Sequence, residues 1–103
     1  MTPIRESKDY MTGYRSMFID TSVPDRQPTD PYWIRVEATE WSTNQWTHHV
    51  IYGPYDKPIN SQGGLYRTIE SSQWTGPPSD IKRQLRRAAR AAMKPFKAEQ
   101  VTP

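Results

Sequence analysis

The chain has 103 residues, a formal net charge of +3 and no cysteine. This length allows one domain at most, and the lack of cysteine excludes disulfides and thiolate metal sites and suits a reducing compartment. No apolar run is long enough to cross a bilayer and the N-terminus has no apolar signal core, so we expect a soluble protein in the cytoplasm.

Residues 1–31 predict a flexible or extended N-terminal arm, because they show no sustained hydrophobic period and "VPDRQPTDP" (23–31) contains three prolines. The short apolar cluster of Met17, Phe18 and Ile19 fits an edge strand and a docked arm equally well. We therefore expect a single compact domain over residues 32–95 and a frayed tail over 96–103.

Two segments with the two-residue period of half-buried strands predict a hairpin. "YWIRVEAT" (32–39) and "WTHHVIY" (46–52) both alternate between an apolar and a more polar face. Thr43-Asn44 between them suits a turn, since asparagine tolerates the left-handed region of backbone dihedrals.

The next segment is ambiguous. "LYRTIESSQW" (65–74) fits a helix through Leu65 and Ile69 or a strand with poor alternation, and the helix over 62–71 is favoured while the strand stays open. "TGPPSD" (75–80) then interrupts the chain, and Ser79 is a good N-cap for a following helix.

The segment 80–94 predicts that helix. Ile81, Leu85, Ala88 and Ala92 form one apolar stripe, and Pro95 is expected to end the helix. The fold class is therefore α+β: a small antiparallel sheet, built on the hairpin 32–39/46–52, is covered by a C-terminal amphipathic basic helix. The sequence does not decide whether the sheet has a third strand, from the N-terminal arm or from around Trp74.

Positive charge is concentrated in this helix. Residues 79–103 hold seven basic and two acidic side chains, a net charge of +5, whereas residues 1–78 have a net charge of −2. Many of the cations stand four residues apart, and such like-sign pairs destabilise a helix by about 0.2–0.5 kcal/mol each. This spacing favours a binding surface over an ordinary solvated one, with these candidate partner-binding residues: Lys82, Arg83, Arg86, Arg87, Arg90 and Lys94.

Trp33 and Arg35 complete the set of candidate partner-binding residues. Strand alternation places Trp33 opposite Ile34 and Val36, where it offers an aromatic anchor for a partner. No pattern indicates a nucleophile, a phosphate-binding loop, a metal site or a cofactor, and His48 and His49 point to opposite faces of a strand. We therefore expect no enzymatic activity, no metal and no cofactor.

"WIRVEATEWSTNQWTHHVIYGPYDK" followed by "GGLYRT" resembles the small accessory proteins encoded by actinobacteriophages. The similarity covers residues 32–70 and includes the "RVE" run, the tryptophan-bearing hairpin and "GPY". It does not extend to the proline-rich arm or the basic segment, and "GGLYRT" departs from the more alanine-rich helix of the family. The resemblance implies a non-enzymatic interaction protein in a bacterial host cell.

Three interpretations of function follow. The favoured one is a phage-encoded accessory protein that binds a host protein through the basic helix and exposed aromatics. The second is a nucleic-acid-binding protein that contacts phosphates with the same helix. The third is a self-assembling structural protein in which the acidic region 1–78 of one copy meets the basic helix of another. None requires a membrane, and the sequence does not identify the partner.

Overall fold

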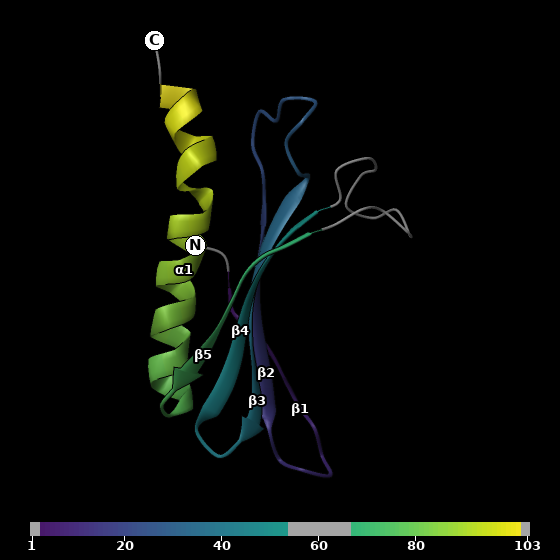
Figure 1. Ribbon diagram of the computed structural model, residues 1–103, viewed down its shortest axis with the longest axis vertical. Helices are drawn as coiled ribbons and strands as arrows, with labels where there is room; N and C mark the ends of the chain where they lie inside the picture. The colour runs from purple at the N-terminus through teal and green to yellow at the C-terminus, as the bar shows by residue number, and fades with distance from the viewer. Residues whose placement is uncertain (1–2, 54–66, 102–103) are drawn as a thin grey trace.

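The computed structural model describes residues 3–53 and 67–101. Over these residues the chain forms a five-stranded antiparallel sheet in the order β1-β2-β3-β4-β5, with one helix against one face (Figure 1). The elements are β1 (Arg5–Lys8), β2 (Arg15–Ser22), β3 (Trp33–Ser42), β4 (Gln45–Gly53), β5 (Arg67–Thr75) and α1 (Pro78–Val101). The fold is therefore α+β, as expected, with a larger sheet than the predicted hairpin, for which a third strand was left open.

The predicted hairpin is formed by β3 and β4. β3 begins one residue later than predicted and ends three residues later, and β4 is one residue longer at each end. Asn44 has a φ of 60°, the left-handed conformation for which asparagine suits the turn. Ile34, Val36 and Ala38 of β3 are buried, as are Trp46 and Val50 of β4. The period-2 alternation thus identifies the inner face of both strands.

The sheet starts well before position 32. β1 and β2 both lie within the segment expected to be a flexible or extended arm, and β2 pairs with β3 from Ser16 to Ser22. Met17 and Ile19 of β2 are 0% and 3% exposed, opposite Ala38 and Val36 of β3. The described part of the N-terminal segment therefore contributes to the core.

The helix favoured for residues 62–71 is wrong from Arg67 onward, because these residues belong to β5, while 62–66 lie outside the described residues. Val50 pairs with Glu70 and Ile51 with Thr68, so Ile69 is an extra residue in β5. This β-bulge shifts the alternation by one position, which is why the sequence shows no clean strand period here.

The helix was predicted too short at both ends. α1 begins at Pro78, which occupies the first helical position, and the Pro77 carbonyl accepts the first helical hydrogen bonds from the Asp80 and Ile81 amides. Ser79 therefore lies inside the first turn and is not the N-cap. α1 also continues through Pro95 to Val101, and Phe96, expected in the frayed tail, packs against the core.

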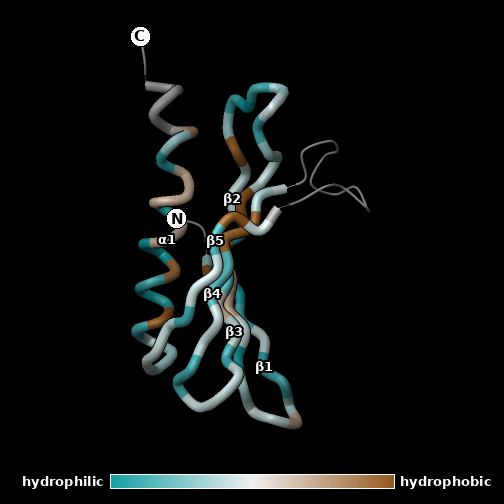
Figure 2. The backbone as a smooth tube through the Cα atoms, viewed as in Figure 1, coloured by the Kyte–Doolittle hydropathy of each residue, from teal (hydrophilic) through white to brown (hydrophobic). Residues whose placement is uncertain are grey.

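The core lies between α1 and the face of the sheet that it covers. Figure 2 shows hydrophobic segments that recur along α1 and in the sheet beside it. Ile81 and Leu85 of the predicted stripe are fully buried, Ala88 and Ala92 are partly buried, and Met93 joins them. Trp46 is fully buried, and its indole N–H donates to the Gly76 carbonyl at 2.9 Å, which fixes the connection between β5 and α1.

Candidate functional site

The six candidate cations on α1 differ in exposure. Arg83, Arg87, Arg90 and Lys94 are exposed, whereas Lys82 and Arg86 are half-buried. The exposed four follow the helix at intervals of three and four residues, the spacing of one helix side. Because Ile81, Leu85 and Met93 hold the other side against the sheet, the four exposed cations face solvent together.

Two of the cations have acidic partners. Lys82 Nζ lies 3.0 Å from Glu6 Oε2 and so connects α1 to β1, while Arg83 Nη2 lies 3.2 Å from Asp80 Oδ1 one turn earlier. Surface pairs of this kind contribute about 0–1 kcal/mol each. Among the described residues no ion pair involves Arg87, Arg90 or Lys94, so these three present their charge to solvent.

Trp33 and Arg35 lie on the opposite side of the molecule from these cations. Their neighbours Ile34 and Val36 point toward α1, so strand alternation places Trp33 and Arg35 on the other face of the sheet, called the open face here. The predicted partner-binding residues therefore form two separate surfaces. A single flat partner cannot contact both.

Arg35 is already occupied within the protein. Its guanidinium forks onto Asp20, with Nε–Oδ1 and Nη2–Oδ2 distances of 2.7 and 2.9 Å, and lies over the rings of Phe18 and Trp33. The hydrogen bonds to Asp20 raise the pKa of Arg35 above its ordinary value. Arg35 thus ties β2 to β3 and gives Trp33 a fixed position, and it is poorly placed to bind a partner carboxylate.

Sequence reasoning missed a cavity of about 230 Å³ between α1 and strands β4 and β5. Its walls are His48, Val50, Glu70, Trp74, Ala88, Ala91 and Ala92. The hollow exists because the side of α1 that lines it carries alanines, whose short side chains do not fill the space above the sheet. It is smaller than the roughly 300–1,000 Å³ of ordinary ligand pockets.

His48 is the notable polar group of this cavity. It is 1% exposed, its ring stacks on Trp74 with centroids 3.9 Å apart, and Nδ1 lies 2.8 Å from the Glu37 carbonyl oxygen. Because a carbonyl only accepts, Nδ1 carries the proton. Burial lowers the pKa of His48, so the imidazole is neutral at neutral pH.

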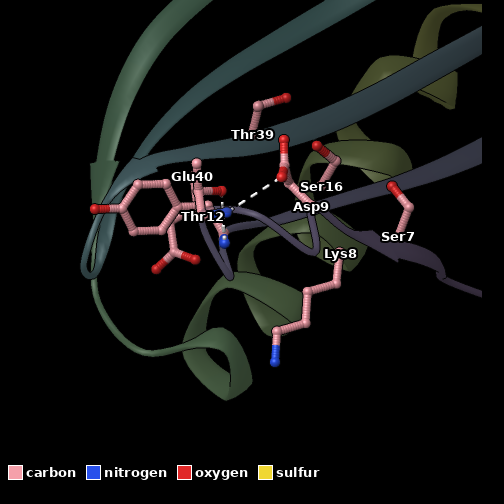
Figure 3. Close-up of a pocket in the computed structure, with 8 residues that line it drawn as sticks. Ser7, Lys8, Asp9, Thr12, Ser16, Thr39 and Glu40 are labelled. Carbon is pink, nitrogen blue, oxygen red and sulfur yellow. Dashed lines mark hydrogen bonds between the residues drawn. The ribbon is translucent and has the colours of Figure 1, made fainter.

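A second, larger hollow of about 460 Å³ lies beside the turn between β1 and β2 (Figure 3). Its two carboxylates accept hydrogen bonds from backbone amides. Asp9 accepts hydrogen bonds from the Met11 and Thr12 amides, and Glu40 accepts from the Arg15 and Asn44 amides. These contacts hold two turns in place, so we assign the hollow a structural role.

Within the described residues no cluster of three or more His, Asp or Glu side chains is arranged to hold a metal ion. In the same part of the chain no helix has both the length and the apolar character needed to span a bilayer. Comparison with protein-family models, with curated proteins and with solved structures finds no match to this chain.

Proposed function

We propose that this protein is a non-enzymatic, phage-encoded accessory protein that binds a host protein in the bacterial cytoplasm through the exposed cations of α1. The phage origin is supported by the resemblance of residues 32–70. The binding role is supported by Arg87, Arg90 and Lys94, which are exposed and have no ion-pair partner among the described residues.

The spacing of these charges supports binding over simple solvation. Arg83/Arg87 and Arg90/Lys94 are like-sign pairs four residues apart, which weaken an isolated helix by about 0.2–0.5 kcal/mol each. An ordinary solvated side would alternate acids and bases. An acidic partner surface would relieve this repulsion, and arginine suits it because its planar fork matches a carboxylate.

A host protein is favoured over a nucleic acid by the side chains between the cations. Between positions 80 and 94, Gln84 has the one side-chain amide that could read a base edge. This side chain is half-buried and therefore not freely exposed to a partner. The cation surface therefore offers charge without base recognition. Trp33 and Arg35 are not part of this proposed surface.

The test compares two double charge reversals of equal size. Arg87→Glu/Arg90→Glu changes the proposed surface, and Arg5→Glu/Lys8→Glu changes two exposed cations of β1. Each protein is used to capture partners from a bacterial host lysate, with and without nuclease treatment, and the captured proteins are identified by mass spectrometry. A captured protein is then purified and titrated against each variant.

We expect the α1 variant to lose about ten-fold or more in affinity, because two reversals at about 0.7–1 kcal/mol each together reach or exceed the roughly 1.4 kcal/mol of a ten-fold change. The β1 variant should bind like the wild type. Equal capture by all three proteins would contradict the proposal. Capture that disappears with nuclease, together with a steep salt dependence of DNA binding, would establish the nucleic-acid alternative instead.

A further inference from the structure

The two edges of the sheet are protected very differently. β1 has four residues, of which Arg5, Glu6 and Lys8 are charged, and short charged edges resist pairing with other strands. β5 has nine residues, and Glu70 is the one charged residue in the stretch 68–75. β5 contains no proline or lysine, and the contacts of α1 with the sheet are concentrated on β2 and β3.

The hydrogen bonds at the end of β5 show which backbone groups face this edge. The Gly76 amide donates to the Asn44 carbonyl at 2.9 Å, and these residues continue the register in which Gln45 opposes Thr75. In an antiparallel ladder, hydrogen-bonded pairs alternate with non-hydrogen-bonded ones. The pairs Trp46–Trp74 and His48–Ser72 are therefore hydrogen-bonded to β4, and the amides and carbonyls of Ser71, Gln73 and Thr75 point outward.

We propose that β5 pairs antiparallel with β5 of a second copy of this chain, across a two-fold axis at Gln73. In this register Gln73 opposes Gln73 of the other copy, and Ser71 opposes Thr75 in both directions. All three outward-facing residues of each copy are used, which gives a continuous ten-stranded sheet. The interface is self-complementary, as a two-fold axis requires.

The bulge and the charges select this register. Because Ile69 interrupts the regular ladder, the usable edge is restricted to residues 70–75, and an axis shifted to Ser71 would bring the bulge into the interface. With the axis at Gln73, Glu70 falls opposite Gly76, so no like charges oppose each other.

The axis is normal to the sheet, so both α1 helices lie on the same face. This assembly goes beyond the proposed function and does not depend on it.

Disulfide trapping tests the register directly, because the native chain has no cysteine. In the proposed pairing the two Gln73 Cα atoms lie about 5.5 Å apart, within the disulfide range of about 4.4–6.8 Å. Gln73→Cys should therefore form a covalent dimer on mild oxidation. Ser7→Cys, an exposed residue on the other edge strand, is the matched control and should remain monomeric.

Charge substitutions at the axis give a second, independent test by sedimentation velocity and native mass spectrometry from micromolar to millimolar concentration. Gln73→Lys and Gln73→Glu each place like charges opposite each other, and each should be monomeric where the wild type is dimeric. Mixing the two should restore a heterodimer. Both lose the hydrogen bonds of Gln73 to Trp41 and Thr47, so recovery on mixing also shows that both variants are folded.

The proposal is overturned by a wild-type protein that stays monomeric at millimolar concentration. It is equally overturned by Gln73→Lys dimers as stable as the wild type, or by Ser7→Cys cross-linking as fast as Gln73→Cys. Dimers that persist in both charge variants but dissociate in high salt would indicate the alternative contact, between the acidic region and the cations of α1.

Discussion

His48 is the residue whose chemistry depends most on the fold. Its imidazole is neutral because burial lowers its pKa below the value of 6.5 found in an exposed chain. Between the lowered pKa and 6.5, the unfolded chain takes up a proton that the native protein does not. The stability contributed by neutral His48 is therefore full above pH 6.5 and decreases as the pH falls toward the native pKa. We expect the urea concentration at the unfolding midpoint to decrease when the pH is lowered from 7.5 to 5.5.

Two histidine variants separate this effect from other titrations. His48→Phe keeps a flat ring against Trp74 but cannot take up a proton, so its urea midpoint should be lower at pH 7.5 and flatter below 6.5. His49→Gln removes the neighbouring imidazole, which contributes to lowering the pKa of His48, so its urea midpoint should still decrease as the pH falls but by less than that of the wild type. A His48→Phe protein with an undiminished response would assign the pH dependence to other groups.

At the scale of elements, the continuation of α1 through Pro95 is contrary to what the sequence indicated. Proline lacks the amide that would donate to the Ala91 carbonyl, and a proline in a helix interior costs about 3 kcal/mol relative to alanine. The helix continues because Phe96 packs edge-on against Tyr52, with ring centroids 5.9 Å apart. Packing beyond the proline offsets its local cost.

Replacing Pro95 by alanine should therefore stabilise the protein by up to about 3 kcal/mol, measured by chemical denaturation. Pro78→Ala is the control, because proline is tolerated at the first helical position and its replacement should change little. An unchanged stability of Pro95→Ala would mean that the helix contributing to cooperative folding ends at Pro95, as its sequence suggests.

The elements that the sequence did predict have a clean hydrophobic period. β3, β4 and the first turns of α1 were predicted because each has buried residues at the regular spacing of its element. The prediction for β2 was ambiguous, since Met17 and Ile19 are the only two of its residues that are fully buried on the inner face. β5 was misassigned because the extra residue Ile69 breaks the alternation, and β1 has no buried residue to signal a strand. Pairing with neighbouring strands, which no local pattern encodes, decides these three.

For the whole molecule, the structure extends the folding unit to the N-terminal strands. Met17, Ile19 and Val23 are all at most 7% exposed, and a buried aliphatic side chain contributes about 1.5–3 kcal/mol. Their joint loss approaches the total stability of a small domain, about 5–15 kcal/mol. A fragment of residues 32–103 should therefore lack the dispersed amide spectrum of a folded protein.

A fragment of residues 10–103 is the matched control, because it loses β1, whose four residues are all exposed, and keeps β2. It should fold with reduced stability, having lost the Glu6 partner of Lys82. A well-dispersed spectrum from residues 32–103 would show instead that the first 31 residues are an appendage to an independent domain.

The division of the candidate site into two surfaces was already implicit in the sequence. Alternation placed Trp33 opposite Ile34 and Val36, and the Ile81–Leu85 stripe had to cover the Ile34–Val36 face. Trp33 and Arg35 therefore could not share a side with the cations of α1. What no pattern revealed was the pairing of Arg35 with Asp20, which depends on the register between β2 and β3.

The place of α1 after the last strand has a consequence for biosynthesis. The sheet is assembled from strands that pair in chain order, whereas its cover is the last of the described elements to be translated. At roughly 5–20 residues per second, the 24 residues of α1 take roughly 1–5 s to synthesise. During that interval the side chains of Met17, Val36 and Trp46 are not covered by α1 and are exposed to solvent. The nascent chain is then most susceptible to aggregation and most in need of chaperones.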